Sequence, residues 1–141
     1  MKNSNKILYS VSGNIAILTI NRPERRNALD AETLEQINIL LDRAESDEKV
    51  RVILITGQGD TFSSGFDLKD QMEKAPEGKE WKPILELDHR TIMRFWNSPK
   101  PTIAAVRGAC LAGGFELSLA CDFTICSKDS FFGEPELKFG A

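Results

Sequence analysis

Two mostly apolar runs, Val50 to Thr56 and Thr102 to Val106, constrain the fold of this chain more than any other feature. Each is typical of a strand that is buried on both faces. Turn-forming residues bound them, since Gly57 to Asp60 follows the first run and Ser98 to Pro101 precedes the second. Segments with helical spacing lie around these runs. Because strands alternate with helices in this way, we predict an α/β fold.

The N-terminal part predicts a hairpin followed by an amphipathic helix. Ile7 to Val11 and Ile15 to Ile20 are β-rich runs, and Ser12-Gly13-Asn14 between them is a turn sequence. Asp30 is a suitable N-cap for the helix that follows. The apolar residues of this helix recur at helical spacing and should pack on the sheet: Leu34, Ile37, Leu41 and Ala44.

The later part of the chain predicts one exposed loop and several further elements. Gln71 to Lys82 is polar and rich in charge, so we expect an exposed, mobile loop there. Ile84 to Trp96 returns to a helical pattern. A short helix is expected over Leu117 to Cys121, and further strands over Phe123 to Ser127 and Phe131-Phe132.

The composition excludes several classes of protein. A chain of 141 residues that is 41% hydrophobic suits one soluble domain. Because no apolar run could span a bilayer and the N-terminus MKNSNKILYS lacks a signal-peptide pattern, we expect a cytoplasmic protein without a membrane partner. The net charge of -3, without a basic block, argues against nucleic acid as a partner.

The three cysteines are Cys110, Cys121 and Cys126. They lie in apolar stretches and lack the close pairing of a zinc site. We therefore expect reduced core residues and no metal site.

The glycine-rich stretch Gly108 to Glu116, which reads GACLAGGFE, directly follows the second buried run. Such a turn lets the backbone approach a ligand, and a helix that begins at about Gly114 leaves its first N–H groups without internal partners. These N–H groups could stabilise a developing negative charge. The same glycines would equally suit a tight strand-to-helix packing, with Glu116 as an ordinary acidic residue of the first turn.

Thr61 to Leu68 places small residues in the same position, after the first buried run and before an expected helix. The N–H of Phe66 could be a second donor, and two donors from separate loops aimed at one oxygen would form an oxyanion hole. Alternatively, Asp67 caps the next helix, and Ser63 and Ser64 simply turn the chain.

Glu134 and Glu136 follow a β-rich run near the end of the chain. A helix, a strand and a return fit between Glu116 and Glu136, so that both carboxylates could face one pocket. There, burial and mutual repulsion would separate their pKa values into an acid and a base. Otherwise, Glu134 and Glu136 are solvated loop residues.

Two other kinds of site are poorly supported. Ser63 and Ser64 lack the nucleophile-elbow pattern, and His89, the single histidine, lies in a charged helix that we expect to be exposed. A serine–histidine mechanism is therefore not expected. Gly57-Gln58-Gly59 lacks the further glycine and the helix of a dinucleotide-binding fingerprint.

Taken together, four segments resemble the crotonase superfamily, that is, the enoyl-CoA hydratase/isomerase family, in their order and spacing. They are NRPERRNAL (Asn21 to Leu29), FSSGFDLK (Phe62 to Lys69), KPTIAAVRGACLAGGFELSLACD (Lys100 to Asp122) and FGEPELKFG (Phe132 to Gly140). The resemblance implies a single crotonase-like (ClpP/crotonase) domain over residues 1–141, built as a spiral of ββα units. It also implies no permanently bound cofactor, since coenzyme A enters as part of the substrate.

The resemblance also implies roles for particular residues. In this family two backbone N–H groups hold the acyl-CoA thioester oxygen, and these positions fall on Phe66 and Gly113. The two catalytic glutamates of family hydratases fall on Glu116 and Glu136, and having both implies an enoyl-CoA hydratase that adds water reversibly to an α,β-unsaturated thioester. The further implied acyl-CoA contacts are Ser64, Leu68, Gly114 and the positively charged Arg25, which suits a phosphate.

Some features depart from the family pattern. Many relatives have a small residue at the position of Phe66 and a glycine at the position of Ala112. Glu134 adds a further carboxylate, so that either Glu134 or Glu136 could face the pocket. Relatives continue well beyond Ala141. The resemblance therefore implies the N-terminal portion of a domain, apparently truncated at its C-terminal side, that forms a homotrimer or a dimer of trimers when full length.

Other functions stay open at this point. An isomerase, a decarboxylase or an acyl-CoA thioester hydrolase of the same fold would share the site, because the pocket wall that sets acyl specificity lies largely beyond Ala141. A non-catalytic relative that binds RNA or protein is an alternative of another class. The acidic balance of charges and the presence of both glutamates argue against it.

Overall fold

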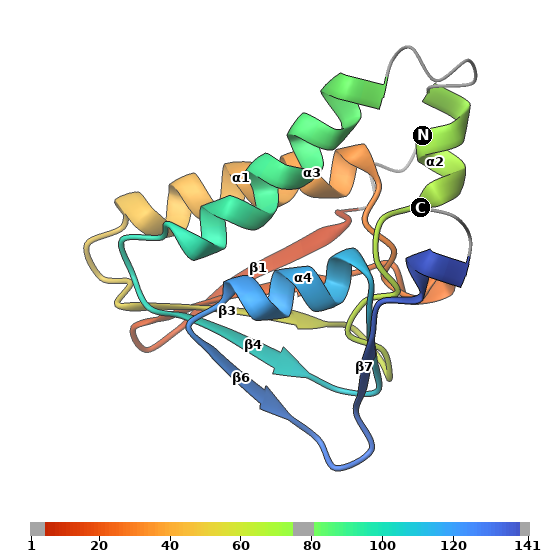
Figure 1. Cartoon of the computed structure of the whole chain (residues 1–141). Coiled ribbons are helices and arrows are strands. Elements are labelled where there is room, and N and C mark those ends of the chain that lie inside the picture. Colours follow the sequence, from red (N-terminus) through yellow and green to blue (C-terminus); the bar gives the residue numbers. More distant parts are fainter. Residues whose placement is uncertain (1–4, 75–80, 139–141) are drawn as a thin grey trace.

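The computed structural model describes residues 5–74 and 81–138 and confirms an α/β fold (Figure 1). Its main sheet has the strand order β1-β2-β3-β4-β6, in which β1 is antiparallel to β2 and the other pairs are parallel. These strands are β1 (Ile7–Ser12), β2 (Ile15–Ile20), β3 (Val52–Gly57), β4 (Thr102–Val106) and β6 (Phe123–Cys126). A second, two-stranded sheet pairs β5 (Ala109–Leu111) with β7 (Phe131–Gly133) in parallel.

The predicted hairpin is confirmed, and both predicted central strands are present. Ser12 pairs with Ile15, so that only Gly13 and Asn14 turn the chain between β1 and β2. β3 lies between β2 and β4 in the sheet. Ile53 and Ile55 are fully buried there, but Val52, Leu54 and Thr56, which alternate with them, are half-buried, so the expected burial on both faces holds for one face only.

Helices α1 (Ala31–Ser46), α3 (Trp81–Trp96) and α4 (Gly113–Ala120) cover the same side of the main sheet (Figure 1). α1 begins where the sequence predicts, because the Asp30 carboxylate accepts a hydrogen bond from the Thr33 N–H at 2.8 Å. The predicted apolar stripe of α1 is buried in the core: Leu34, Ile37, Leu41 and Ala44.

The predicted loop over Gln71 to Lys82 is wrong at both of its ends. Leu68–Lys74 forms helix α2, α3 begins at Trp81, and residues 75–80 lie outside the described residues. The polar sequence of α2 misleads because Gln71 is buried and finds its hydrogen-bond partner, Asp88, on α3. A buried polar side chain of this kind depends on a tertiary contact that local sequence does not contain.

The chain repeats a unit of two strands followed by a helix, which confirms the predicted spiral of ββα units. β4 joins the main sheet, β5 joins the second sheet, and α4 follows. β6 and β7 repeat this alternation and lead into the 3₁₀ helix η2 (Pro135–Lys138). Because β5 and β7 are parallel neighbours, the segments that follow them, α4 and η2, begin at the same end of the second sheet.

Cys110 and Cys121 are buried and free, as predicted, but Cys126 is exposed. The prediction of a core position is wrong for Cys126 because β6 is the edge strand of the main sheet, and its four residues are exposed in the part of the chain that the structure describes. In residues 5–74 and 81–138, none of the helices has the length and apolar character needed to cross a membrane.

Candidate active site

The NRPERRNAL segment, which contains the 3₁₀ helix η1 (Pro23–Arg25), holds the segment that follows β3 in place. Asn27 is fully buried with a φ of 54°, and its side-chain amide donates to the Thr61 carbonyl at 2.7 Å. Two backbone hydrogen bonds continue this contact, because the Leu29 N–H donates to the Gly65 carbonyl at 2.8 Å and the Asp67 N–H donates to the Leu29 carbonyl at 2.9 Å. The path of residues 61–67 is thereby set from one side.

The glycine-rich stretch holds the same segment from the other side. The Leu111 N–H donates to the Ser63 carbonyl at 3.0 Å. A Cβ atom on Gly114 would lie 2.7 Å from the Cβ of Ser63, and one on Gly65, where φ is 99°, would lie 2.6 Å from the Cβ of Ala112. Only glycine fits such close approaches of two backbones. The predicted tight packing is therefore present, and it brings the two loops together.

The backbone N–H groups of Phe66 and Gly113 lie at the junction of these two loops. Neither N–H donates to an acceptor within residues 5–74 and 81–138. A Cβ on Gly65 would lie 3.1 Å from the Gly113 nitrogen, and a Cβ on Gly113 would lie 2.5 Å from the Phe66 ring. Two available donors, one of them at the first residue of α4, can stabilise negative charge on a ligand oxygen.

Ala112, the residue before Gly113, has a backbone conformation that a side chain disfavours. Its φ is 52° and its ψ is -132°, a region that is populated mainly by glycine. Two hydrogen bonds hold it there, since its N–H donates to the Gly133 carbonyl and its carbonyl accepts from the Glu116 N–H, each at 2.9 Å. Strain that is held by the surrounding structure is a common feature of functional sites.

Ala112→Gly should therefore stabilise the protein, because glycine removes the strain at this position. The strain relief exceeds the extra unfolded-state entropy of glycine, so we expect the free energy of unfolding to rise by about 1 kcal/mol. Urea unfolding measures it. Ala105→Gly, in the regular strand β4, is the control and should lower the free energy of unfolding by about 0.5–1 kcal/mol. Equal losses in both variants would contradict the assigned strain.

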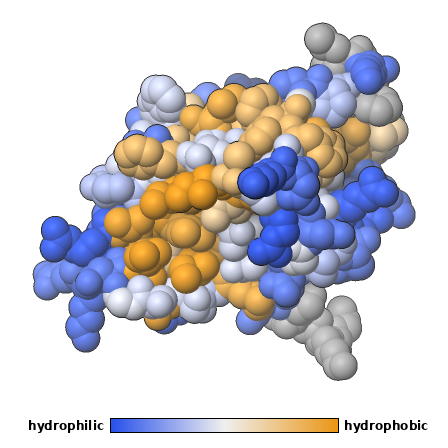
Figure 2. Space-filling model, turned by 90° about the horizontal axis from the view of Figure 1, so that it is seen from below, coloured by the Kyte–Doolittle hydropathy of each residue, from blue (hydrophilic) through white to orange (hydrophobic). Residues whose placement is uncertain are grey.

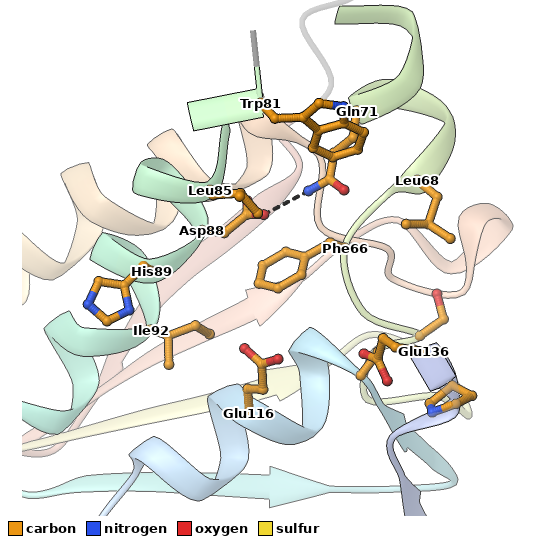
Figure 3. Close-up of a pocket in the computed structure, with 13 residues that line it drawn as sticks. Phe66, Leu68, Gln71, Trp81, Leu85, Asp88, His89, Ile92, Glu116 and Glu136 are labelled. Atoms are coloured by element: carbon orange, nitrogen blue, oxygen red, sulfur yellow. Dashed lines mark hydrogen bonds between the residues drawn. The ribbon is translucent and has the colours of Figure 1, made fainter. Parts of the chain in front are cut away.

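Glu116 on α4 and Glu136 on η2 face one cavity from different elements (Figure 3). Glu134 lies close to both, because the three residues each place a carboxylate oxygen within 4.8 Å of the others. Glu134 is not among the described residues that line the cavity, so Glu136 is the one that faces it. Oxygen ligands of this kind suit hard cations, but exposed acidic groups are also common without a metal.

The pKa values of two of these carboxyl groups, Glu116 and Glu134, are raised. Burial, followed by the charge of Glu136, raises the pKa of Glu116. Burial, together with Glu136 and Glu116, raises the pKa of Glu134 to about 7. One carboxylate oxygen of Glu136 is buried without a hydrogen-bond partner among the described residues. The group therefore retains a proton at near-neutral pH, which suits acid–base chemistry.

The cavity has a volume of 540 Å³, which lies in the range of small-molecule sites. Ser64, Phe66 and Leu68, three of the predicted substrate contacts, line it, whereas Gly113 and Gly114 are buried and are not among the described lining residues. Other parts of its wall were not predicted, and Figure 3 shows that they come from α2 and α3: Gln71, Trp81, Leu85, Asp88, His89 and Ile92. His89 is exposed on α3, as expected.

A shallower groove of 430 Å³ continues from the cavity, since it shares Ser64, Phe66 and Leu68 with it. Arg25 lines this groove together with two further cations, Arg26 and Lys69. The Arg25 side chain is 45% exposed and lies 3.4 Å from the Asp67 carboxylate. Its remaining guanidinium donors are therefore available to an anionic ligand.

Comparison with known proteins assigns the chain to a family. The family model described as enoyl-CoA hydratase/isomerase matches residues 10–141. This chain belongs to the enoyl-CoA hydratase/isomerase family. A Bacillus subtilis (strain 168) protein named "Probable enoyl-CoA hydratase" is 40% identical over 137 residues, which cover 96% of this chain and 52% of that protein. The short-chain-enoyl-CoA hydratase of Clostridium acetobutylicum is 34% identical over 138 residues, with coverage of 96% and 52%.

Solved structures of the family share the fold. The crystal structure of an enoyl-CoA hydratase/isomerase from Xanthobacter autotrophicus Py2 is 59% identical to this chain, with a TM-score of 0.94. The match covers 97% of this chain and 51% of that structure. The chain thus spans about half the length of the relatives that it matches.

In this member of the enoyl-CoA hydratase/isomerase family, a buried polar pair lies in the cavity wall. Gln71 Nε2 donates to Asp88 Oδ2 at 2.7 Å, and the two residues are 7% and 6% exposed. Burial raises the pKa of Asp88 to about 6, the Gln71 hydrogen bond opposes this, and the charges of Glu116 and Asp70 add to it. The helical spacing of the sequence indicates that Asp88 is buried, because Asp88 lies on the same face of α3 as the buried Phe95.

Asp88→Asn should stabilise this protein at neutral pH, because the asparagine keeps an acceptor for Gln71 and never ionises. The raised pKa means that the folded state retains a proton that the unfolded state releases. Asp88 therefore contributes stability at low pH, and this contribution is lost as the pH rises from about 4 to about 6. We expect the variant to be more stable than the wild type by about 1–2 kcal/mol at about pH 7.5.

Urea unfolding of both proteins across this pH range measures the effect. The difference in free energy of unfolding between variant and wild type should shrink as the pH falls below about 5. A difference that is constant with pH would show that Asp88 is not the titrating group.

Proposed function

We propose that this chain is part of an enzyme that adds water reversibly to α,β-unsaturated acyl-CoA thioesters. One observation carries the proposal: two carboxylates, Glu116 and Glu136, face one cavity that Phe66 and Ala112 also line. The backbone N–H groups of Phe66 and of Gly113, the residue after Ala112, lack acceptors in the described part of the chain. Relatives named as enoyl-CoA hydratases, at 40% and 34% identity, support the same activity.

In this proposal the thioester oxygen accepts hydrogen bonds from the N–H groups of Phe66 and Gly113. These donors stabilise the negative charge that develops on the oxygen when water adds to the β-carbon and an enolate forms. The two loops that carry these N–H groups are held by backbone hydrogen bonds and by close contacts at glycines. Little reorganisation of the loops is therefore needed during the reaction.

The two cavity carboxylates move the protons. One takes a proton from the water whose oxygen bonds to the β-carbon, and the other delivers a proton to the α-carbon. The reverse reaction returns both protons and releases water. The pKa of Glu116, which burial and the charge of Glu136 raise, supports this division of roles, because two interacting carboxylates favour one protonated and one ionised partner.

The groove that continues from the cavity is the proposed path of the coenzyme A moiety. Arg25 would contact a phosphate group there, and Arg26 and Lys69 add positive charge to the same groove. Ser64 and Leu68 line both the groove and the cavity, so they would lie beside the pantetheine chain where it enters the acyl site.

The proposal extends to a cytoplasmic homotrimer or dimer of trimers. Figure 2 shows apolar side chains gathered on the lower face of the molecule, the side on which β6 and β7 lie in Figure 1. The exposed large apolar residues of α4, β6 and β7 are Leu119, Phe123, Ile125, Phe131 and Phe132. An exposed apolar patch of this kind supports an assembly in which it is covered.

Hydration of a short 2-enoyl-CoA by the full-length protein tests the proposed activity. We expect the absorbance of the conjugated thioester to fall and mass spectrometry to identify a 3-hydroxyacyl-CoA. A product with a shifted double bond, a lost carboxyl group or a cleaved thioester, formed without addition of water, would replace the hydratase assignment with one of the other activities of this fold.

A further inference from the structure

The acyl cavity combines apolar walls with one buried polar pair. Phe66, Trp81, Leu85 and Ile92 supply apolar surface, whereas Gln71 on α2 and Asp88 on α3 lie beside each other in the same wall (Figure 3). Glu116 faces the same cavity from α4. The proposed proton transfers use Glu116 and Glu136, so that Gln71 and Asp88 are left without a part in the reaction.

The hydrogen bond between Gln71 and Asp88 uses only part of their capacity. Gln71 Nε2 donates to Asp88 Oδ2, but no donor among residues 5–74 and 81–138 reaches Asp88 Oδ1 or Gln71 Oε1. Neither oxygen is among the fully buried side-chain atoms that lack a partner, so each keeps some accessible surface where its residue lines this cavity and a smaller neighbouring pocket of 200 Å³. Two neighbouring acceptors therefore need a donor, since an unsatisfied polar group in an apolar site is costly.

On the basis of the proposed function, we infer that Asp88 and Gln71 select acyl groups that carry a hydroxyl group away from the thioester. The hydroxyl would donate to Asp88 Oδ1 or Gln71 Oε1 while the rest of the acyl chain contacts the apolar wall. A few well-placed polar groups in an otherwise apolar pocket commonly set ligand specificity in this way.

A hydroxyl group fits these acceptors better than other polar groups do. A carboxylate on the acyl chain would be repelled by Asp88 and Glu116, which face the same cavity. An ammonium group would be attracted by these carboxylates, but it would lose its hydration against the apolar wall, and the desolvation of a cation costs far more than that of a neutral hydroxyl and can exceed the gain from ion pairing. A neutral donor avoids both penalties.

A purely structural role for the pair is the competing explanation, because the hydrogen bond also ties α2 to α3. The two explanations differ in what they predict for substrates. A tie between helices would affect all acyl-CoA substrates alike, whereas a specificity site would change the ratio of hydroxylated to plain substrates.

The experiment compares a short unsubstituted 2-enoyl-CoA with its counterpart of equal length that is hydroxylated at the terminal carbon. The double variant Asp88→Leu/Gln71→Met replaces both polar side chains with apolar ones of similar size, so that neither partner is left buried and unpaired. The single variant Asp88→Asn keeps an acceptor at the same place. For each full-length protein we would measure kcat/KM with both substrates and, by calorimetry, the affinity for both 3-hydroxyacyl-CoA products.

The wild type should favour the hydroxylated substrate by about 10–100-fold in kcat/KM, mostly through KM, and the double variant should lose this preference while keeping its rate with the plain substrate. Asp88→Asn should retain most of it. An equal preference in the wild type and the double variant would overturn the inference even though hydration occurs. Failure of the wild type to hydrate either substrate would instead overturn the proposed function.

Discussion

Glu116→Gln and Glu136→Gln should each lower kcat for hydration by about 10²–10⁴-fold, with little change in KM. Glutamine keeps the shape of each side chain but cannot exchange a proton, and both positions face the cavity. Because the two carboxylates act on the same substrate in sequence, the double variant should lose little beyond the more damaging single variant. Steady-state kinetics with a short 2-enoyl-CoA measures these effects.

Glu134→Gln is the matched control for this pair. Glu134 carries the same functional group within the same cluster, but it is not among the described residues that line the cavity. We expect its rate loss to stay within about tenfold, the size of an indirect electrostatic effect. If Glu116→Gln and Glu136→Gln both left the rate intact, the two-carboxylate mechanism would be wrong.

Gly65→Ala should lower kcat/KM by about 10²-fold and the free energy of unfolding by about 2–3 kcal/mol. The new Cβ would meet the Ala112 Cβ at 2.6 Å and the Leu111 carbonyl oxygen at 3.0 Å, in a residue whose φ is 99°. A carbonyl oxygen and a Cβ atom are fixed by the backbone and cannot yield as the end of a flexible side chain would. The two loops must therefore separate, and the N–H groups of Phe66 and Gly113 move apart.

Gly13→Ala isolates the backbone penalty from the crowding. Gly13 has a φ of 58° in the hairpin turn, and no atom lies within 4 Å of the position of a new Cβ. In this variant the free energy of unfolding should fall by about 1 kcal/mol, and the hydration rate should stay at the wild-type level. Chemical denaturation and the hydration assay, applied to both variants, separate the two effects. Full activity in Gly65→Ala would rule out a role for loop spacing in the proposed oxyanion hole.

Patterns that depend on neighbours in the chain were predicted well. The spacing of Leu34, Ile37 and Leu41 predicts the buried face of α1, and Asp30 predicts where that helix begins. Turn residues around β3 and β4 predict the ends of the central strands. In each case the cause acts over one or two turns of helix or one strand, so the sequence alone carries it.

The part of the cavity wall that α2 and α3 supply was not predicted, and the reason is physical. Gln71 lies in a polar stretch and is buried only because Asp88, on another helix, accepts its hydrogen bond. Cys126 lies in an apolar stretch and is exposed because β6 is an edge strand in the described sheet. Burial at these positions is decided by which elements pack together, and local composition does not contain that information.

The sequence by itself determined the family, the α/β class and the residues expected to act on a thioester, because the glycines and glutamates stand in motifs that can be read along the chain. Only the tertiary structure decided that Glu136 rather than Glu134 faces the cavity and that Asp88 shares it with Glu116. The contacts between α3 and α4, and between Glu116 on α4 and Glu136 after β7, join residues that are far apart in the chain, and their geometry exists only after the elements have packed on the sheet.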